Sequence, residues 1–79
     1  MKIHLAQLAP DVSENELRAL LQKFGEVREV RFIGPKDAAE PAAVVEMDGG
    51  HAAAEVVRHR LDGTVLHGKP LFVDVLLFS

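Results

Sequence analysis

The chain has no cysteine, no tryptophan and no tyrosine, and aromatic residues make up only 5% of it. Without cysteine, neither a disulfide bond nor a thiolate metal site can stabilise the fold. This composition fits a reducing compartment, so we expect a protein of the cytoplasm, or of the nucleus if the source is a eukaryote. The first residues read as a strand and show no signal-peptide pattern, from which we expect that the protein is not secreted.

Positive charge and long hydrophobic runs are also scarce. The formal net charge is −3 at pH 7, whereas proteins that bind nucleic acid strongly usually carry a basic excess. The sequence therefore argues against strong non-specific binding to RNA or DNA. The longest apolar stretch, residues 75–78, is too short to span a bilayer, and we expect no membrane partner.

The sequence does contain an alternation of strand and helix patterns over 79 residues, which is enough for one small domain, residues 1–79. Period-two alternation predicts four strands, at residues 2–8, 27–33, 40–47 and 71–77. Helical spacing of apolar residues predicts one helix after Ser13 and a second at residues 51–61. Residues 64–70 connect the second helix to the last strand, and we expect a small hairpin there.

The first helix has the clearest sequence signals at both ends. Ser13 is followed three residues later by Glu16, the spacing of a capping box. Apolar residues then recur at i, i+3, i+4 and i+7, namely Leu17, Leu20, Leu21 and Phe24. The next residue, Gly25, is expected to end the helix as a C-cap glycine. By the same kind of reasoning, Asp48 is a candidate cap for the second helix.

The strand at residues 40–47 is apolar on both faces, which predicts a central place in the sheet. Its alternation assigns Ala43, Val45 and Met47 to the face beneath the helices. Ala42 and Val44 then lie on the open face, where no aromatic ring stands on this strand. We expect the functional surface on that open face.

The order of elements is β-α-β-β-α-β. Strand–helix–strand crossovers are right-handed, which brings the first and third strands together in the middle of the sheet. The expected architecture is therefore α+β, a ferredoxin-like sandwich in which a four-stranded antiparallel sheet has two helices on one face.

In this layout the chain resembles an RNA recognition motif domain from end to end. Residues 3–8 occupy the place of the family's hexamer motif, and residues 40–47 occupy the place of its octamer motif. Residues 61–64 and 68–73 are similar to the usual end of the family's pattern. The resemblance implies a non-catalytic module that binds single-stranded RNA across the open sheet face.

The departures from the family pattern concern the residues that would contact RNA. The positions where the family carries stacking aromatic residues hold His4, Ala42 and Val44, and the octamer begins with Glu40 and Pro41 instead of a basic residue and glycine. Base stacking contributes about 1–3 kcal/mol per base, so the loss of two rings removes on the order of 2–6 kcal/mol, roughly 30-fold to 10⁴-fold in affinity. Any RNA bound through the sheet is expected to bind weakly.

Two functions remain open for the expected open face. In one, His4 and Phe72 stack bases while Lys2 and Arg31 meet phosphates. In the other, the aliphatic residues of this face contact a protein partner or a second copy of the chain. The candidate RNA- or partner-binding residues are Lys2, His4, Arg31, Ala42, Val44 and Phe72.

The sequence offers no set of residues for catalysis. It has no recognisable Ser-His-Asp set, Gly-rich phosphate loop or close carboxylate pair, so we expect neither an enzyme nor a cofactor. His51, His59 and His67 fit neither zinc-finger spacing nor a helical i, i+4 pair, and we expect no metal.

Overall fold

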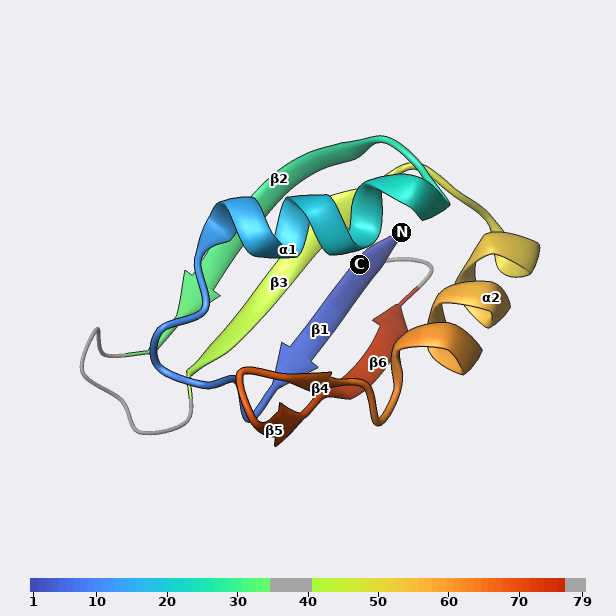
Figure 1. Ribbon diagram of the computed structural model, residues 1–79. Coiled ribbons are helices and arrows are strands. Elements are labelled where there is room, and N and C mark those ends of the chain that lie inside the picture. Colours follow the sequence, from blue (N-terminus) through green and yellow to red (C-terminus); the bar gives the residue numbers. More distant parts are fainter. Residues whose placement is uncertain (35–40, 77–79) are drawn as a thin grey trace.

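The computed structural model describes residues 1–34 and 41–76, with the Leu76 side chain left out. Figure 1 shows the strands and helices in the expected β-α-β-β-α-β order, with a small hairpin between α2 and the last strand. The elements are β1 (Lys2–Ala6), α1 (Glu14–Leu21), the 3₁₀ helix η1 (Gln22–Phe24), β2 (Val27–Ile33), β3 (Ala42–Met47), α2 (His51–Leu61), β4 (Val65–Leu66), β5 (Lys69–Pro70) and β6 (Phe72–Leu76). Glu40 and Leu77, which the sequence assigned to strands, lie outside the described residues.

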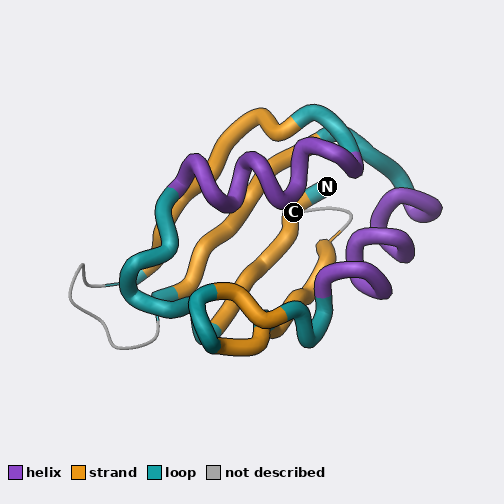
Figure 2. The backbone as a smooth tube through the Cα atoms, viewed as in Figure 1, coloured by secondary structure: helices purple, strands orange, loops and turns teal. Residues whose placement is uncertain are grey.

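The main sheet has four antiparallel strands in the order β2-β3-β1-β6. Both helices cover the same face of this sheet, and no helix of residues 1–34 and 41–76 lies on the other face (Figures 1 and 2). The predicted ferredoxin-like α+β architecture is therefore confirmed. No helix within the described part of the chain is long and apolar enough to cross a membrane.

The core lies between the sheet and the two helices, and the predicted alternation of β3 accounts for it. Ala43, Val45 and Met47 are at most 1% exposed and pair across the sheet with neighbouring inward-facing residues. Other buried contributors include the inward residues of β1 and one stripe of each helix, namely Ile3, Leu5, Leu17, Leu21, Val57 and Leu61. The register of the central strand is confirmed, so Ala42 and Val44 belong to the opposite face.

The start of α1 agrees with the sequence, and the helical run ends at Gly25 as predicted, although its last turn is the 3₁₀ helix η1. Ser13 and Glu16 form the predicted capping box, each side chain accepting the other residue's backbone N–H. The helix continues as η1 after Leu21, and Gly25 is the C-cap of η1: its N–H donates to the Gln22 carbonyl at 3.4 Å, and its backbone is extended (φ 162°, ψ 173°) and not left-handed. A Cβ on Gly25 would lie 2.6 Å from the Asp48 carbonyl oxygen, so this glycine permits a close backbone approach.

Two predictions in the connecting segments were wrong. The first strand ends at Ala6, two residues early, because Gln7 has a left-handed backbone (φ 58°). Asp48 does not cap α2, whose N-cap is Gly50 without a side-chain hydrogen bond. Instead the Asp48 carboxylate accepts two hydrogen bonds from Arg28, at 2.7 and 3.0 Å. This bidentate pair joins the irregular start of β2 to the segment after β3.

The expected hairpin at residues 64–70 is present as β4 and β5. Its two turn residues, His67 and Gly68, both have positive φ, at 53° and 82°. Positive φ at both central positions is the geometry of the tight turns that match the twist of a hairpin. The turn projects His67 away from the hairpin strands toward the beginning of α1.

Candidate functional site

The uncovered sheet face is organised in rows that run across the strands, because antiparallel register places paired residues on the same side. The first row holds Ile33, Ala42, Ala6 and Phe72. The second row holds Arg31, Val44, His4 and Asp74. The third row includes Glu29, Glu46 and Lys2. Each row therefore combines residues from segments far apart in the sequence.

The first row is apolar from one edge of the sheet to the other. Its ends are the most exposed, with Ile33 at 44% and Phe72 at 51%. Ala42 and Ala6 between them are half-buried and short, so they form a low surface between two larger side chains. A flat strip of this kind can receive a base or an apolar side chain.

The second row places the imidazole of His4 at the centre of the face. His4 lies directly opposite Val44 on β3 and opposite Asp74 on β6. Phe72 is two residues from Asp74 on the same strand, so it is a diagonal neighbour of His4, within reach of a long or aromatic side chain. His4 and Phe72, the two ring-bearing side chains among the described residues of the face, therefore lie on adjacent strands.

Acidic side chains accompany both basic residues of the face. The Arg31 guanidinium forms an ion pair with Glu29 at 2.8 Å, and both side chains are well exposed. Lys2 lies directly opposite Glu46. These four residues and Val44 surround a shallow hollow of about 100 Å³. The positive charge of the face is therefore partly balanced by neighbouring carboxylates, and its described residues form no continuous basic track.

All six candidate residues from the sequence lie on strands of this one sheet, with Lys2 and His4 on β1, Ala42 and Val44 on β3, Arg31 on β2 and Phe72 on β6. Arg31 and Val44 are directly paired, whereas Phe72 stands on the opposite edge strand from Arg31. The sequence reasoning missed the part played by Glu29 and Glu46. The alternation of Glu29 with Arg31 was a usable signal for the first, since i and i+2 share a face.

The described residues give no sign of a metal centre, because no three histidine or carboxylate side chains within residues 1–34 and 41–76 are grouped as a metal ion requires. The arrangement on the sheet face offers stacking, apolar contact and a few ionic contacts. Such groups are suited to binding a ligand.

A family model of the RNA recognition motif matches residues 3–71. The chain belongs to the RNA recognition motif family. The family is one of binding modules, and stacking on its sheet face is how its members contact RNA. In this member the corresponding positions on β1 and β3 carry an imidazole and two aliphatic side chains.

Solved structures resemble the chain over nearly its whole length. The crystal structure of RNA-binding protein PG1 is 27% identical, with 100% of this chain and 96% of that chain covered and a TM-score of 0.82. A homodimer of NONO-1 from C. elegans is 25% identical, with 92% of this chain and 27% of that chain covered and a TM-score of 0.73. The RNA recognition motif of Rna15 with bound GU RNA is 16% identical, with 92% and 79% covered and a TM-score of 0.74. A comparison with curated protein sequences finds no match.

Proposed function

We propose that the domain is a non-catalytic module for single-stranded RNA, which it binds weakly through the uncovered sheet face. The observation that carries this proposal is the presence of His4 and Phe72 on adjacent strands of that face, with two cations on the same surface. Membership of the family supports it, as does the likeness to RNA-binding protein PG1.

Stacking supplies the contact with the bases. The exposed ring of Phe72 and the half-buried imidazole of His4 can each lie against one base. Their diagonal arrangement on neighbouring strands suits two nucleotides that follow one another. Ala42 and Val44 offer apolar contact to the same nucleotides but no ring face, which is why the stacking is weakened relative to family members with aromatic residues there.

Phosphate contacts come from Arg31 and Lys2. A phosphate that binds Arg31 has to compete with the Glu29 carboxylate, which already lies 2.8 Å from the guanidinium. Lys2 has Glu46 opposite it. Because both cations are partly compensated, the electrostatic contribution is small, and affinity is set mainly by the two rings.

The direct test is a titration of the ¹⁵N-labelled protein with a single-stranded RNA octamer of mixed sequence at low salt, followed by NMR. We expect amide shifts on β1, β3 and β6, and we expect Phe72→Ala to weaken binding about fivefold or more. Phe32→Ala is the matched control, because Phe32 is 40% exposed but pairs with the buried Ala43 and so belongs to the helix side of the sheet. If no sheet amide shifts at about 1 mM RNA, the proposal is wrong.

A second function is favoured by the apolar first row, which runs across all four strands and leaves Ile33 and Phe72 exposed. On this proposal the sheet face contacts a protein, in the simplest case a second copy of the chain; the similar NONO-1 structure is a homodimer. Such an interface needs about 800 Å² from each partner.

Sedimentation equilibrium tests whether the chain self-associates through the sheet face. Val44→Asp should dissociate a dimer, whereas Val56→Asp on the exposed side of α2 should not. A protein that stays monomeric at high concentration removes self-association.

A further inference from the structure

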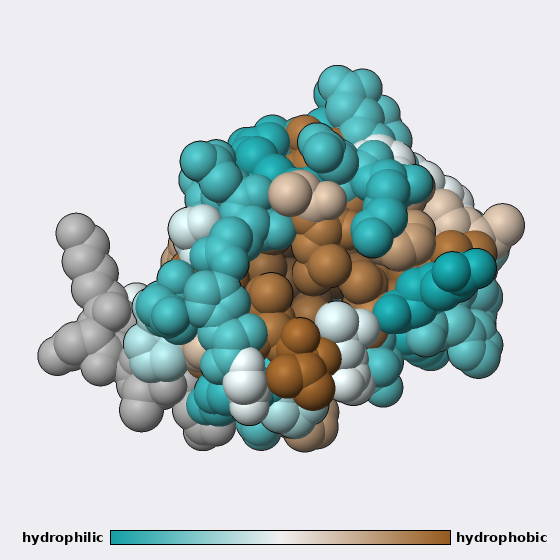
Figure 3. Space-filling model, viewed as in Figure 1, coloured by the Kyte–Doolittle hydropathy of each residue, from teal (hydrophilic) through white to brown (hydrophobic). Residues whose placement is uncertain are grey.

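A groove lies on the helix side of the molecule, away from the sheet face. Seen from that side, hydrophobic surface gathers in a hollow between the two helices, with hydrophilic surface around it (Figure 3). The groove has a volume of about 220 Å³. Its lining comes from the end of α1, from η1, from the end of α2 and from the segment between α2 and β4, and consists of Leu20, Lys23, Phe24, Arg60, Leu61 and Thr64.

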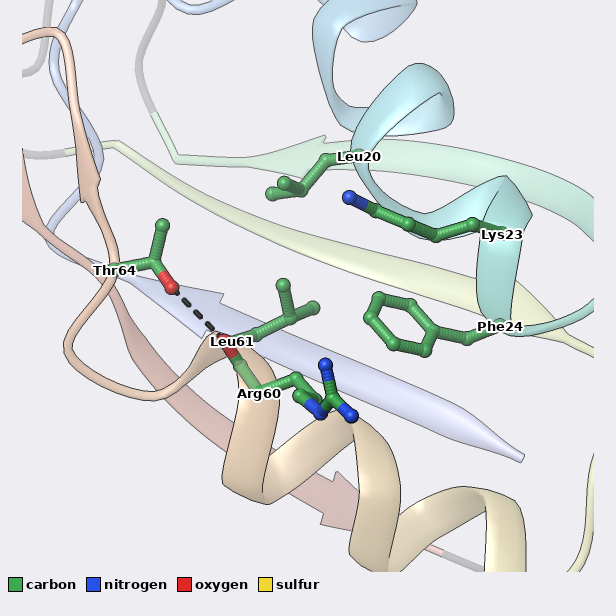
Figure 4. A pocket seen from close by; sticks show the side chains of 6 residues that line it. All are labelled: Leu20, Lys23, Phe24, Arg60, Leu61 and Thr64. Atoms are coloured by element: carbon green, nitrogen blue, oxygen red, sulfur yellow. Dashed lines mark hydrogen bonds between the residues drawn. The ribbon is translucent and has the colours of Figure 1, made fainter.

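The walls of the groove are apolar because part of the α1 stripe is left uncovered. Leu17 and Leu21 are fully buried against the sheet, but Leu20 and Phe24 of the same stripe are only half-buried. Figure 4 shows Leu20 and Phe24 on one side of the space and Leu61 on the other. An apolar side chain inserted here would be in contact with three hydrophobic residues from two helical segments.

The rim of the groove is positively charged. Lys23 and Arg60 extend on opposite sides of the space, one from η1 and the other from α2 (Figure 4). The Lys23 ammonium lies 5.9 Å from the centroid of the Phe24 ring, and within the described segments neither cation takes part in an ion pair. No carboxylate from the described part of the chain lines the groove. A chain with a net charge of −3 therefore keeps a small basic site around an apolar hollow.

The volume of the groove and the fixed position of Arg60 limit the kind of ligand that the groove can bind. Sites for small molecules and cofactors usually measure roughly 300–1,000 Å³, so a groove of about 220 Å³ suits one or two side chains instead. The Thr64 hydroxyl donates to the Arg60 carbonyl at 3.1 Å and so holds the last turn of α2 in place. The position from which Arg60 extends is therefore fixed before a ligand arrives.

We propose that this groove docks an acidic peptide segment of a partner protein, which inserts one large apolar side chain between Leu20, Phe24 and Leu61 and places carboxylates near Lys23 and Arg60. The charge of the rim selects acidic over basic segments, and the apolar walls supply the contact that holds the anchor. The site is separate from the sheet face, so the domain can hold RNA and a protein segment on opposite sides at the same time.

The test uses a synthetic heptapeptide, capped at both ends, with a central phenylalanine and aspartate at the six other positions. Titration into the ¹⁵N-labelled protein should shift amides of Leu20, Phe24, Leu61 and Thr64 and leave β1 and β3 unchanged. Replacing the phenylalanine by alanine should weaken binding about tenfold or more, because the buried apolar area is lost. The same peptide with lysine in place of aspartate should not bind.

Two protein variants, each replacing basic residues by glutamate, test whether the charges of the groove rim, and not positive charge elsewhere on the surface, bind the peptide. Lys23→Glu combined with Arg60→Glu should weaken the peptide about tenfold, whereas Arg58→Glu, which is exposed on α2 but does not line the groove, should change affinity less than about twofold. The double variant should still show RNA-dependent shifts at His4 and Phe72. Equal binding of the lysine peptide, shifts confined to the sheet face, or no groove shift at about 1 mM peptide would each overturn the proposal.

Discussion

His67 and Glu16, 51 residues apart in the sequence, are hydrogen-bonded through imidazole Nε2 and carboxylate Oε2. The other ring nitrogen, Nδ1, lies 2.8 Å from the Asp11 carboxylate. The second Glu16 oxygen accepts the backbone N–H of Ser13 at 3.0 Å, so one residue serves both the cap of α1 and the link to the β4–β5 turn. Because a carboxylate only accepts, both ring nitrogens must donate, and this arrangement requires the protonated imidazolium.

This link should make folding stability depend on pH above neutrality. The hydrogen bond with Glu16, and to a smaller extent the one with Asp11, raises the pKa of His67 above its ordinary value of 6.5. A raised pKa means that the folded state holds its proton more tightly, so the stabilisation is complete below about pH 6.5 and is lost as the pH rises through the folded-state pKa. We expect a lower urea midpoint at pH 8.5 than at pH 6, and an NMR titration of the His67 ring should show the raised pKa directly.

The carboxylates of Asp11 and Glu16 should make folding stability depend on pH in the acidic range as well. The hydrogen bond with His67 holds the pKa of Asp11 below 3.8 and, together with the Ser13 backbone N–H, holds the pKa of Glu16 below 4.5. Their contribution to folding stability is therefore present above the ordinary pKa values of 3.8 and 4.5, and it is lost as the pH falls through the lowered pKa values of the folded state.

His67→Gln should flatten the alkaline decrease in the urea midpoint between pH 6 and pH 8.5, because the charged link is no longer present. His59→Gln, on the exposed side of α2, is the matched control and should leave the decrease unchanged. The same decrease in the His67→Gln protein as in the wild type would show that the link has no part in the pH dependence.

Gly25→Ala should destabilise the fold by about 1–3 kcal/mol, the usual range for inserting atoms into a packed site. The added Cβ would lie 2.6 Å from the Asp48 carbonyl oxygen and 3.3 Å from the Met47 side chain, and the first of these neighbours is backbone. Asp48 is itself held there by a backbone hydrogen bond to Glu26 at 3.0 Å. Urea unfolding measures the loss.

Gly50→Ala provides the comparison for that prediction, since a Cβ at Gly50 meets nothing within 4 Å and its backbone is extended. Its cost should not exceed about 1 kcal/mol, the usual scale for a change at an N-cap position. Equal losses for the two variants would mean that the close approach at Gly25 is not the cause.

The part of the fold that the sequence predicted rests on local periodicity. The alternation of Ala42 to Met47 was sufficient to assign β3 and both of its faces, and Ser13 with Glu16 was sufficient to begin α1. The errors concern contacts between distant segments. Gly25 does cap the helical run, but its close approach to Asp48 is visible only after β3 is placed beside β2, and Asp48 resembled a cap because Arg28 is twenty residues away.

For the candidate site, too, the sequence predicted what depends on local periodicity and missed what depends on contacts between distant segments. Period-two alternation within each strand was enough to collect Lys2, His4 and Arg31 on one face. It did not reveal that Glu46 stands opposite Lys2, because that pairing depends on the register between β1 and β3. The balance of charge on the face therefore required the assembled sheet, even though the residues involved were all visible in the sequence.

The salt dependence of RNA binding should be shallow. Lys2 and Arg31 are the two basic residues among the rows of the sheet face, so at most about two phosphates are neutralised, and the slope of log K against log salt should be no steeper than about −1.4 for a single strand. Arg31→Gln should reduce the slope by about 0.7, whereas Arg58→Gln on α2 should not change it. Fluorescence anisotropy at several salt concentrations gives these values, and a slope near −3 would place phosphates on a different surface.

Restoring one ring at the centre of the face should strengthen RNA binding. Val44 is half-buried and lies directly opposite His4, so a phenylalanine there would add a stacking surface beside the imidazole. One added stacked base is worth about 1–3 kcal/mol, so Val44→Phe should tighten RNA binding roughly 5- to 100-fold in anisotropy titrations. Val56→Phe makes the same chemical change at a 47% exposed position on α2 and should have no effect. If Val44→Phe left the affinity within about twofold of wild type while the fold was intact, RNA would not lie over β3 and the aliphatic surface would have to serve a protein partner instead.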